Sequence, residues 1–90
     1  MEVIFHGNVL DHTAGVSSYT LTEAADAPEN VRELIGELGQ RFGAGLEEFL
    51  LGDKTCLLLV NGRGIMLTGG MGTLLKPGDT VTVLPFVDAG

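Results

Sequence analysis

The middle of the chain carries one apolar stripe with helical spacing, and this feature limits the folds that the sequence can adopt. Five apolar residues fall at i, i+3, i+4, i+7 and i+11, which places them on one face of a helix. They are Val31, Leu34, Ile35, Leu38 and Phe42. A helix with one apolar face needs a second layer to cover, and the segments on either side of it have the character of strands. We therefore expect a sheet with this helix across its face.

Both ends of the predicted helix have local signals. Asn30 with Glu33 forms a capping-box pattern, and Asp26 with Glu29 offers a second start one turn earlier. Gly43 follows the last apolar position and suits the left-handed residue that ends many helices. The sequence leaves the start open between these two positions and ends the helix before Gly43.

Strand-like segments precede the helix, and a shorter helical segment follows it. Residues 1–10 and 16–22 alternate between apolar and polar side chains, and residues 11–15, DHTAG, have turn chemistry. We expect these segments to form a hairpin. Residues 44–54 are expected to hold a short helical turn that adds to the core.

The second half of the chain predicts further strands. Residues 55–63 form a continuous apolar run that ends at Asn61-Gly62, which is typical of a buried strand entering a tight turn. Residues 65–73 predict a short strand followed by a flexible glycine-rich loop, residues 74–79 a turn, and residues 80–86 the last strand. The order of elements indicates an α+β fold, with a mixed sheet packed on one main helix.

Length and charge limit the classes of partner. The chain has 90 residues and a formal net charge of −7, with five basic residues scattered along it. This length suits one domain. The charge argues against binding to nucleic acid or to an anionic membrane, and favours a protein partner with a basic surface. A single cysteine, Cys56, and the lack of an apolar leader make the cytoplasm the expected location.

The sequence lacks the patterns of an independent enzyme. The stretch TGGMGT at residues 68–73 does not fit either of the common phosphate-binding patterns. His6, His12 and Cys56 have no paired spacing of the kind that a metal site needs, so we predict no metal and no bound cofactor. No serine or cysteine nucleophile stands in a recognisable catalytic arrangement with either histidine.

The C-terminal end of the chain is the remaining candidate. Residues 1–85 are predicted to form the domain, and residues 86–90 an extended tail that tapers from Phe86 and Val87 through Asp88 and Ala89 to Gly90. A tapered segment suits threading into a narrow channel of a partner. The alternative is a frayed terminus without a role, which is common. The tail by itself does not decide between them.

Two stretches of the sequence resemble the MoaD/ThiS family of ubiquitin-like sulfur carriers. These are LLLVNGR at residues 57–63 and LLKPGDTVTVLPFVDAG at residues 74–90. They contain the valine-asparagine-glycine end of a strand, a lysine-x-glycine-aspartate turn, a proline near the end of the last strand and a terminal glycine. The MoaD type, the small subunit of molybdopterin synthase, is the more similar of the two. The resemblance implies the β-grasp fold, with a mixed sheet around one main helix.

The resemblance also implies a function. A ThiF-like adenylating enzyme would use ATP to activate the carboxylate of Gly90, and a persulfide sulfur would then convert it to a thiocarboxylate. The tail would deliver this sulfur to a protein similar to the large subunit of molybdopterin synthase. Pro85 and residues 86–89 would bind the partners, and the chain would be a co-substrate without catalytic groups of its own. By strand alternation, we expect Val81 and Val83 to face the helix and Leu84 to point outward, where it would join an exposed apolar patch that also binds the partner.

The sequence departs from the family pattern at two places. Ala89 stands where the family has glycine, and its extra methyl group disfavours a positive φ. The stretch TGGMGT has no counterpart in the matched motifs. Two alternatives therefore stay open at this point. One is a β-grasp interaction module without C-terminal chemistry, and the other is a protein modifier that is joined to lysines through the same carboxylate.

Overall fold

The structure is a computed structural model, and it describes residues 1–21, 28–52 and 56–85. The five strands are β1 (Glu2–Phe5), β2 (Ser18–Thr20), β3 (Cys56–Val60), β4 (Arg63–Gly64) and β5 (Thr80–Pro85). The two α-helices are α1 (Val31–Phe42) and α2 (Ala44–Leu51). Three 3-10 helices complete the described elements: η1 (Gly7–His12), η2 (Ile65–Leu67) and η3 (Gly70–Gly72).

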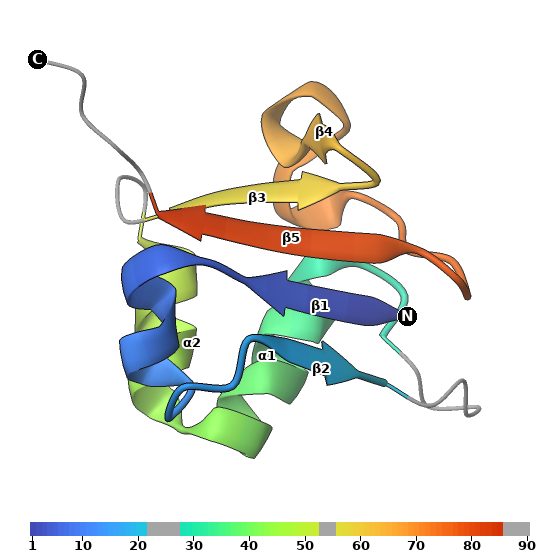
Figure 1. Cartoon of the computed structure of the whole chain (residues 1–90). Helices are drawn as coiled ribbons and strands as arrows, with labels where there is room; N and C mark the ends of the chain where they lie inside the picture. The colour runs from blue at the N-terminus through green and yellow to red at the C-terminus, as the bar shows by residue number, and fades with distance from the viewer. Residues whose placement is uncertain (22–27, 53–55, 86–90) are drawn as a thin grey trace, which may run out of the picture.

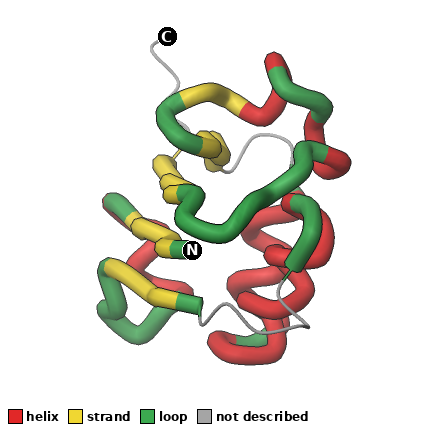
Figure 2. The backbone as a smooth tube through the Cα atoms, turned by 90° about the vertical axis from the view of Figure 1, so that its right-hand side faces the viewer, coloured by secondary structure: helices red, strands yellow, loops and turns green. Residues whose placement is uncertain are grey.

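The strands form one mixed sheet in the order β2-β1-β5-β3-β4. The first and last strands, β1 and β5, lie parallel at its centre, and the other pairs are antiparallel. A parallel pair needs a long crossover connection, and here α1 lies within that connection. Figure 1 shows α1 and α2 on one side of the sheet, and Figure 2 shows strands and helices as two layers. The predicted α+β class and β-grasp arrangement are confirmed.

The core lies between α1 and the inward side of the sheet. The predicted stripe is confirmed, because its first four residues are at most 2% exposed. The fifth, Phe42, is half-buried and meets the rings of Phe5 and Tyr19 edge to face, with centroids 5.7 and 5.5 Å away. The sheet contributes Val3, Phe5, Leu58, Val60, Val81 and Val83, all less than 9% exposed. The prediction that Val81 and Val83 face the helix is therefore confirmed.

The helix begins at the later of the two predicted starts. The Oδ1 atom of Asn30 accepts a hydrogen bond from the Glu33 N–H at 2.8 Å, and the Glu33 side chain accepts one from the Glu29 N–H at 3.3 Å. The first bond pairs an N–H group that a helix start otherwise leaves without a partner, and the second ties the residue before the cap to the first turn. Gly43 has a φ of +109° and donates its N–H to Gly39 O, so the predicted end is also confirmed. Asp26, the earlier start, lies outside the described residues.

The first strand is shorter than predicted. It ends at Phe5, because Gly7 takes a φ of +62° and turns the chain into η1, where residues 7–10 had been expected to continue the strand. The 3-10 turn places Val9 in the core with no exposed surface. The hairpin pairing with β2 is confirmed by the antiparallel register of Val3 with Tyr19.

Three other segments differ from their predictions. Residues 44–51 form the complete helix α2 where only a turn was expected. Residues 65–67 form η2, so the predicted short strand is wrong. The glycine-rich stretch is a hydrogen-bonded turn, since the hydroxyl oxygens of Thr68 and Thr73 lie 3.0 Å apart and Thr73 Oγ1 donates to Gly70 O at 2.7 Å. The two threonine hydroxyls supply bonds that the glycine count alone does not predict.

Among the residues that the structure describes, no helix combines the length and the apolar content needed to cross a membrane.

Candidate functional site

The tail begins at the central strand of the sheet. Pro85 ends β5, with Cys56 of β3 opposite it on one side. On the other side, the His6 N–H donates to Val83 O at 3.0 Å, so the polar backbone groups of Val83 face β1. By strand alternation, the ring nitrogen of Pro85 also faces that side, where β1 has already ended. A residue without an N–H therefore ends the strand where no donor is needed.

The turn at Gly7 fits closely against this strand end. A Cβ atom at Gly7 would lie 2.7 Å from Cγ of Pro85, which is closer than van der Waals contact allows. The positive φ of Gly7 is a second reason why glycine suits this position. The base of the tail is thus fixed by β3 on one side and by the start of η1 on the other. Residues 86–90, which include the predicted Gly90 site, lie outside the described residues.

An apolar patch adjoins the base of the tail on the face of the sheet that points away from the helices. We call Ile4, Leu57, Leu59 and Leu84 the outer-face patch. Leu57 lies opposite Leu84, and both Leu59 and Ile4 lie beside Thr82, so the patch crosses three neighbouring strands. Leu57 is 46% exposed and the other three are half-buried. The patch offers a partner an apolar surface beside Pro85, the last described residue before the tail.

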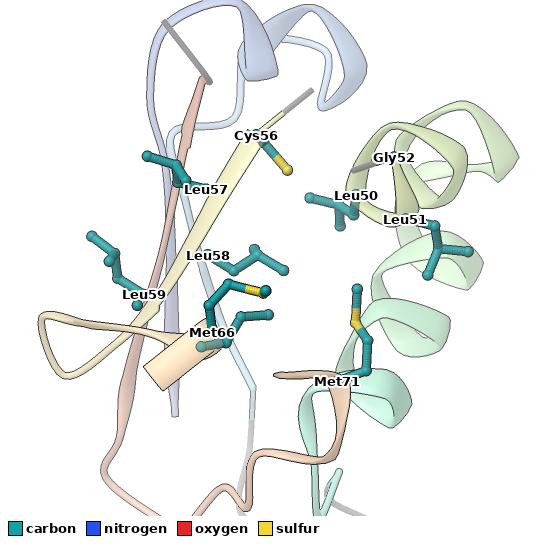
Figure 3. A pocket seen from close by; sticks show the side chains of 11 residues that line it. Leu50, Leu51, Gly52, Cys56, Leu57, Leu58, Leu59, Met66 and Met71 are labelled. Carbon is teal, nitrogen blue, oxygen red and sulfur yellow. The ribbon is translucent and has the colours of Figure 1, made fainter. Parts of the chain in front are cut away.

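This patch corrects one prediction and supports another. Residues 55–63 were expected to be a fully buried strand, yet Leu57 and Leu59 point away from the helices, whereas Leu58 points toward them (Figure 3). Only alternate residues of the run enter the core, because helices cover one face of the sheet alone. Leu84 lies on the outer face, as predicted. The sequence analysis missed Leu57, and its place opposite Leu84 follows only from the strand register.

The two motifs that carried the resemblance meet in space at the opposite end of β5. The side-chain N–H of Asn61 donates to Asp79 Oδ1 at 2.9 Å, and Asn61 Oδ1 accepts from the Thr80 N–H at 3.0 Å. Asp79 Oδ2 in turn accepts from the Lys76 N–H at 2.8 Å. Asn61 and Gly62 have φ values of +53° and +84°, as a tight two-residue hairpin turn requires. We call this set of bonds the Asn61–Asp79 clasp.

The clasp determines the electrostatic state of Asp79. The hydrogen bond from Asn61 is the main reason why the pKa of Asp79 lies below its ordinary value, and the Lys76 backbone N–H and ammonium group lower it further. Both bonds favour the ionised carboxylate. The clasp therefore links the two turns around a charged group.

The candidate metal ligands do not form a site. The ring of His12 stacks on that of Phe49 with centroids 4.6 Å apart, and the Cys56 sulfur lies 3.9 Å from Phe49 O. Within residues 1–21, 28–52 and 56–85, no three histidine, cysteine, aspartate or glutamate side chains gather as a metal ion requires. Of the predicted partner-binding residues, Leu84 and Pro85 lie at the base of the tail, and the remainder lie outside the described residues.

Comparison with known families shows to which family the chain belongs. The model of the ThiS family matches residues 11–90, which include both turns of the clasp and the C-terminal glycine. The chain belongs to the ThiS family. The resemblance to ubiquitin-like sulfur carriers is therefore confirmed at the level of the family, whereas no curated protein matches the chain in sequence.

Solved structures show the same fold. CysO of Mycobacterium tuberculosis has a TM-score of 0.80 and 24% identity, with 96% of this chain and 98% of that chain covered. In the BexX/CysO complex of Amycolatopsis orientalis, the similar chain has a TM-score of 0.78 and 25% identity, covering 99% and 98%. A putative molybdopterin converting factor subunit 1 from Pyrococcus furiosus has a TM-score of 0.67 and 28% identity, covering 96% and 95%.

Proposed function

We propose that this ThiS-family protein carries sulfur as a thiocarboxylate on Gly90. The observation that supports the proposal most is the match of the family model, which extends to the terminal glycine. The base of the tail adds a physical argument. A tail that leaves the central strand from a rigid base, beside an exposed apolar patch, suits a carrier whose end must enter the active site of another protein.

The chemistry needs three steps, and partner enzymes supply the catalytic groups for all of them. The carboxylate oxygen of Gly90 attacks the α-phosphorus of ATP, forming an acyl-adenylate and releasing pyrophosphate. The terminal sulfur of a persulfide then attacks the acyl carbon and displaces AMP. A thiol cleaves the resulting acyl disulfide, which leaves the thiocarboxylate and an oxidised disulfide. The carrier supplies only the carboxylate, and ATP belongs to the partner.

The outer-face patch is the proposed docking surface for a ThiF-like adenylating enzyme. The net charge of −7 favours a partner with a basic surface around an apolar centre. Leu84→Asp puts a charge into the patch and is expected to weaken binding to this enzyme about tenfold or more. Thr20→Asp, an exposed position on β2 that lies opposite Glu2 and not opposite a patch residue, is the matched control and should bind normally. Equal affinity of the two variants would refute the role of the patch.

The proposed destination of the sulfur is molybdopterin, delivered through a protein similar to the large subunit of molybdopterin synthase. Support comes from the similarity to a putative molybdopterin converting factor subunit at 28% identity. The test is to mix the thiocarboxylate form with such a large subunit and its sulfur-free pterin substrate. Formation of molybdopterin with loss of the thiocarboxylate supports the destination. A stable thiocarboxylate in this mixture, alongside a working carrier as control, would assign the sulfur to another pathway.

A protein modifier is the second candidate function. The small archaeal modifier protein 1 of Methanosarcina acetivorans has a TM-score of 0.75 and 25% identity to this chain. Both candidates start from an activated Gly90, but a modifier ends in an amide bond to a lysine of another protein. Conjugates that survive thiol treatment and disappear when Gly90 is deleted would support the modifier. Their absence, together with a thiocarboxylate, would support the carrier.

A further inference from the structure

A second apolar feature lies on the other side of β3 from the outer-face patch. It is a cavity of about 150 Å³ between β3, the C-terminal end of α2 and the segment from η2 to η3. Figure 3 shows Leu58 and Met66 on one side of this space, and Leu50, Leu51 and Met71 on the other. We call this space the β3 cavity. A cavity of this size and apolar lining holds a group about as large as benzene.

The β3 cavity has a buried floor and an exposed rim. Leu50, Leu58 and Ile65 are at most 7% exposed, whereas Leu51 is 46% and Met66 is 87% exposed. A methionine at the rim can adapt to different apolar groups, because its side chain is unbranched and polarizable. An apolar side chain that enters the cavity would therefore meet a fixed floor and an adaptable rim.

Part of the edge of β3 beside this cavity has no neighbouring strand among the described residues. The short strand β4 pairs only with Leu59 and Val60 of β3. Beside Leu57 and Leu58, therefore, no other strand among the described residues lies on the side opposite β5. An extended peptide segment fits such an edge because its alternate side chains point to one side.

The segment of the chain that carries β3, β4, η2 and η3 is basic, unlike the protein as a whole. Residues 54–78 contain Lys54, Arg63 and Lys76 and not a single acidic residue, although the chain has twelve acidic residues in all. Arg63 is exposed and directly precedes Gly64, which lines the cavity. Lys54 lies outside the described residues. Arg63 thus places a positive charge at one side of an apolar cavity, which is the complement of an apolar side chain flanked by carboxylates. On the other side of the cavity, α2 carries Glu47 and Glu48.

We propose that the β3 cavity binds an extended, acidic peptide segment of a partner protein, with one large apolar side chain of that segment inserted between Met66 and Met71. The cavity lies on the helix side of β3, although Leu57 and Leu59 of the outer-face patch also border it. The proposal does not depend on sulfur transfer.

The chain's three methionines allow a direct test. With methyl-¹³C-methionine in the full chain, Met66 and Met71 report on the cavity, while Met1 lies in the core beside Leu21 and serves as an internal control. The probe is the acetylated, amidated peptide Glu-Asp-Leu-Phe-Asp-Glu, titrated to millimolar concentration. We expect the Met66 and Met71 methyl signals to shift and that of Met1 to stay. No shift of either cavity methionine would overturn the proposal.

Two control peptides separate the apolar and the charged contributions. Replacing Leu-Phe by Ser-Ser should abolish the shifts, and replacing the four acidic residues by lysine should weaken binding at least about threefold. Equal binding of either control peptide would contradict the proposed recognition.

Matched variants of the protein test the same two contributions. Met66→Ala should weaken binding at least about threefold when read at Met71, whereas Leu67→Ala, 86% exposed and outside the cavity lining, should not. Arg63→Glu should weaken binding about three- to tenfold, and Arg32→Glu, with the same charge change on α1, should not. If the two methionine and leucine variants weakened binding equally, or if the two arginine variants did, the assignment of the site would be overturned.

Two further measurements address other occupants. Phe86→Ala in the free protein should leave the Met66 and Met71 signals unchanged, and a shift would show that the chain's own tail fills the cavity. Vesicles of phosphatidylglycerol should not shift these signals. A shift with vesicles would mean that a membrane, rather than a peptide, occupies this surface, and either result would refute the proposal.

Discussion

Replacing Asn61 tests whether the Asn61–Asp79 clasp is a structural device. Asn61→Ala removes the bond to Asp79 Oδ1 and the bond from the Thr80 N–H, which have lengths of 2.9 and 3.0 Å. Each such bond contributes about 0.5 to 1.5 kcal/mol. Alanine also fits the φ of +53° poorly, at a cost of about 1 kcal/mol. We expect a total loss of about 2 to 4 kcal/mol in the free energy of unfolding.

The matched variant Asn61→Gly separates these two contributions. Glycine removes the same two side-chain bonds but accepts a positive φ without strain. It should therefore be more stable than Asn61→Ala by about 1 kcal/mol, and less stable than the natural protein by about 1 to 3 kcal/mol.

The assay is equilibrium unfolding in urea, followed by far-ultraviolet circular dichroism. A shift of the midpoint at constant slope reports stability alone. If Asn61→Gly unfolds at the same urea concentration as the natural protein, the two bonds do not stabilise the fold, and the structural explanation of the motif fails. If Asn61→Ala and Asn61→Gly are equal, the backbone argument fails separately.

Two further predictions concern the pH dependence of the clasp and the base of the tail. The pKa of Asp79 is lowered in the folded protein, so its contribution is present at neutral pH and is lost as the pH falls below about 4 through that lowered pKa. Asp79→Asn should reduce stability at pH 7 and flatten the acid side of a urea-midpoint-against-pH profile, and an unchanged profile would contradict this. Gly7→Ala combines a φ of +62° with a Cβ 2.7 Å from Pro85, whereas Gly15→Ala has a φ of +84° and open space. Thermal unfolding should show Gly7→Ala as the less stable by about 1 to 3 kcal/mol, and equal values would refute the close fit at the base of the tail.

The helix and the sheet class could be predicted because local sequence determines them directly. The apolar stripe and the Asn30 cap define α1, and the alternation in residues 80–85 defines the inward and outward faces of β5. The residue at which the first strand ends could not be predicted by the same reasoning. Its alternation continues past Phe5, and only the packing of Gly7 against Pro85, 78 residues later, explains why the strand ends there.

The candidate site was predictable in part. Leu84 could be assigned to the outer face from alternation alone. Leu57 could not, because a continuous apolar run gives no sign of which residues face outward until the register opposite Leu84 is known. The clasp was likewise hidden, since Asn61 and Asp79 are 18 positions apart and each looks like an ordinary turn residue. The β3 cavity depends on three segments that meet only in the folded chain.

The most direct test of the sulfur-carrier proposal is the intact mass of the protein after incubation with a ThiF-like adenylating enzyme from its own organism, ATP and a sulfur donor. The proposal predicts a gain that corresponds to the exchange of one oxygen for sulfur, located in the last peptide and absent when Gly90 is deleted. This result would also show that Ala89 is accepted. No gain, while a carrier ending in Gly-Gly is modified by its own enzyme in parallel, would contradict the proposal and favour an interaction module.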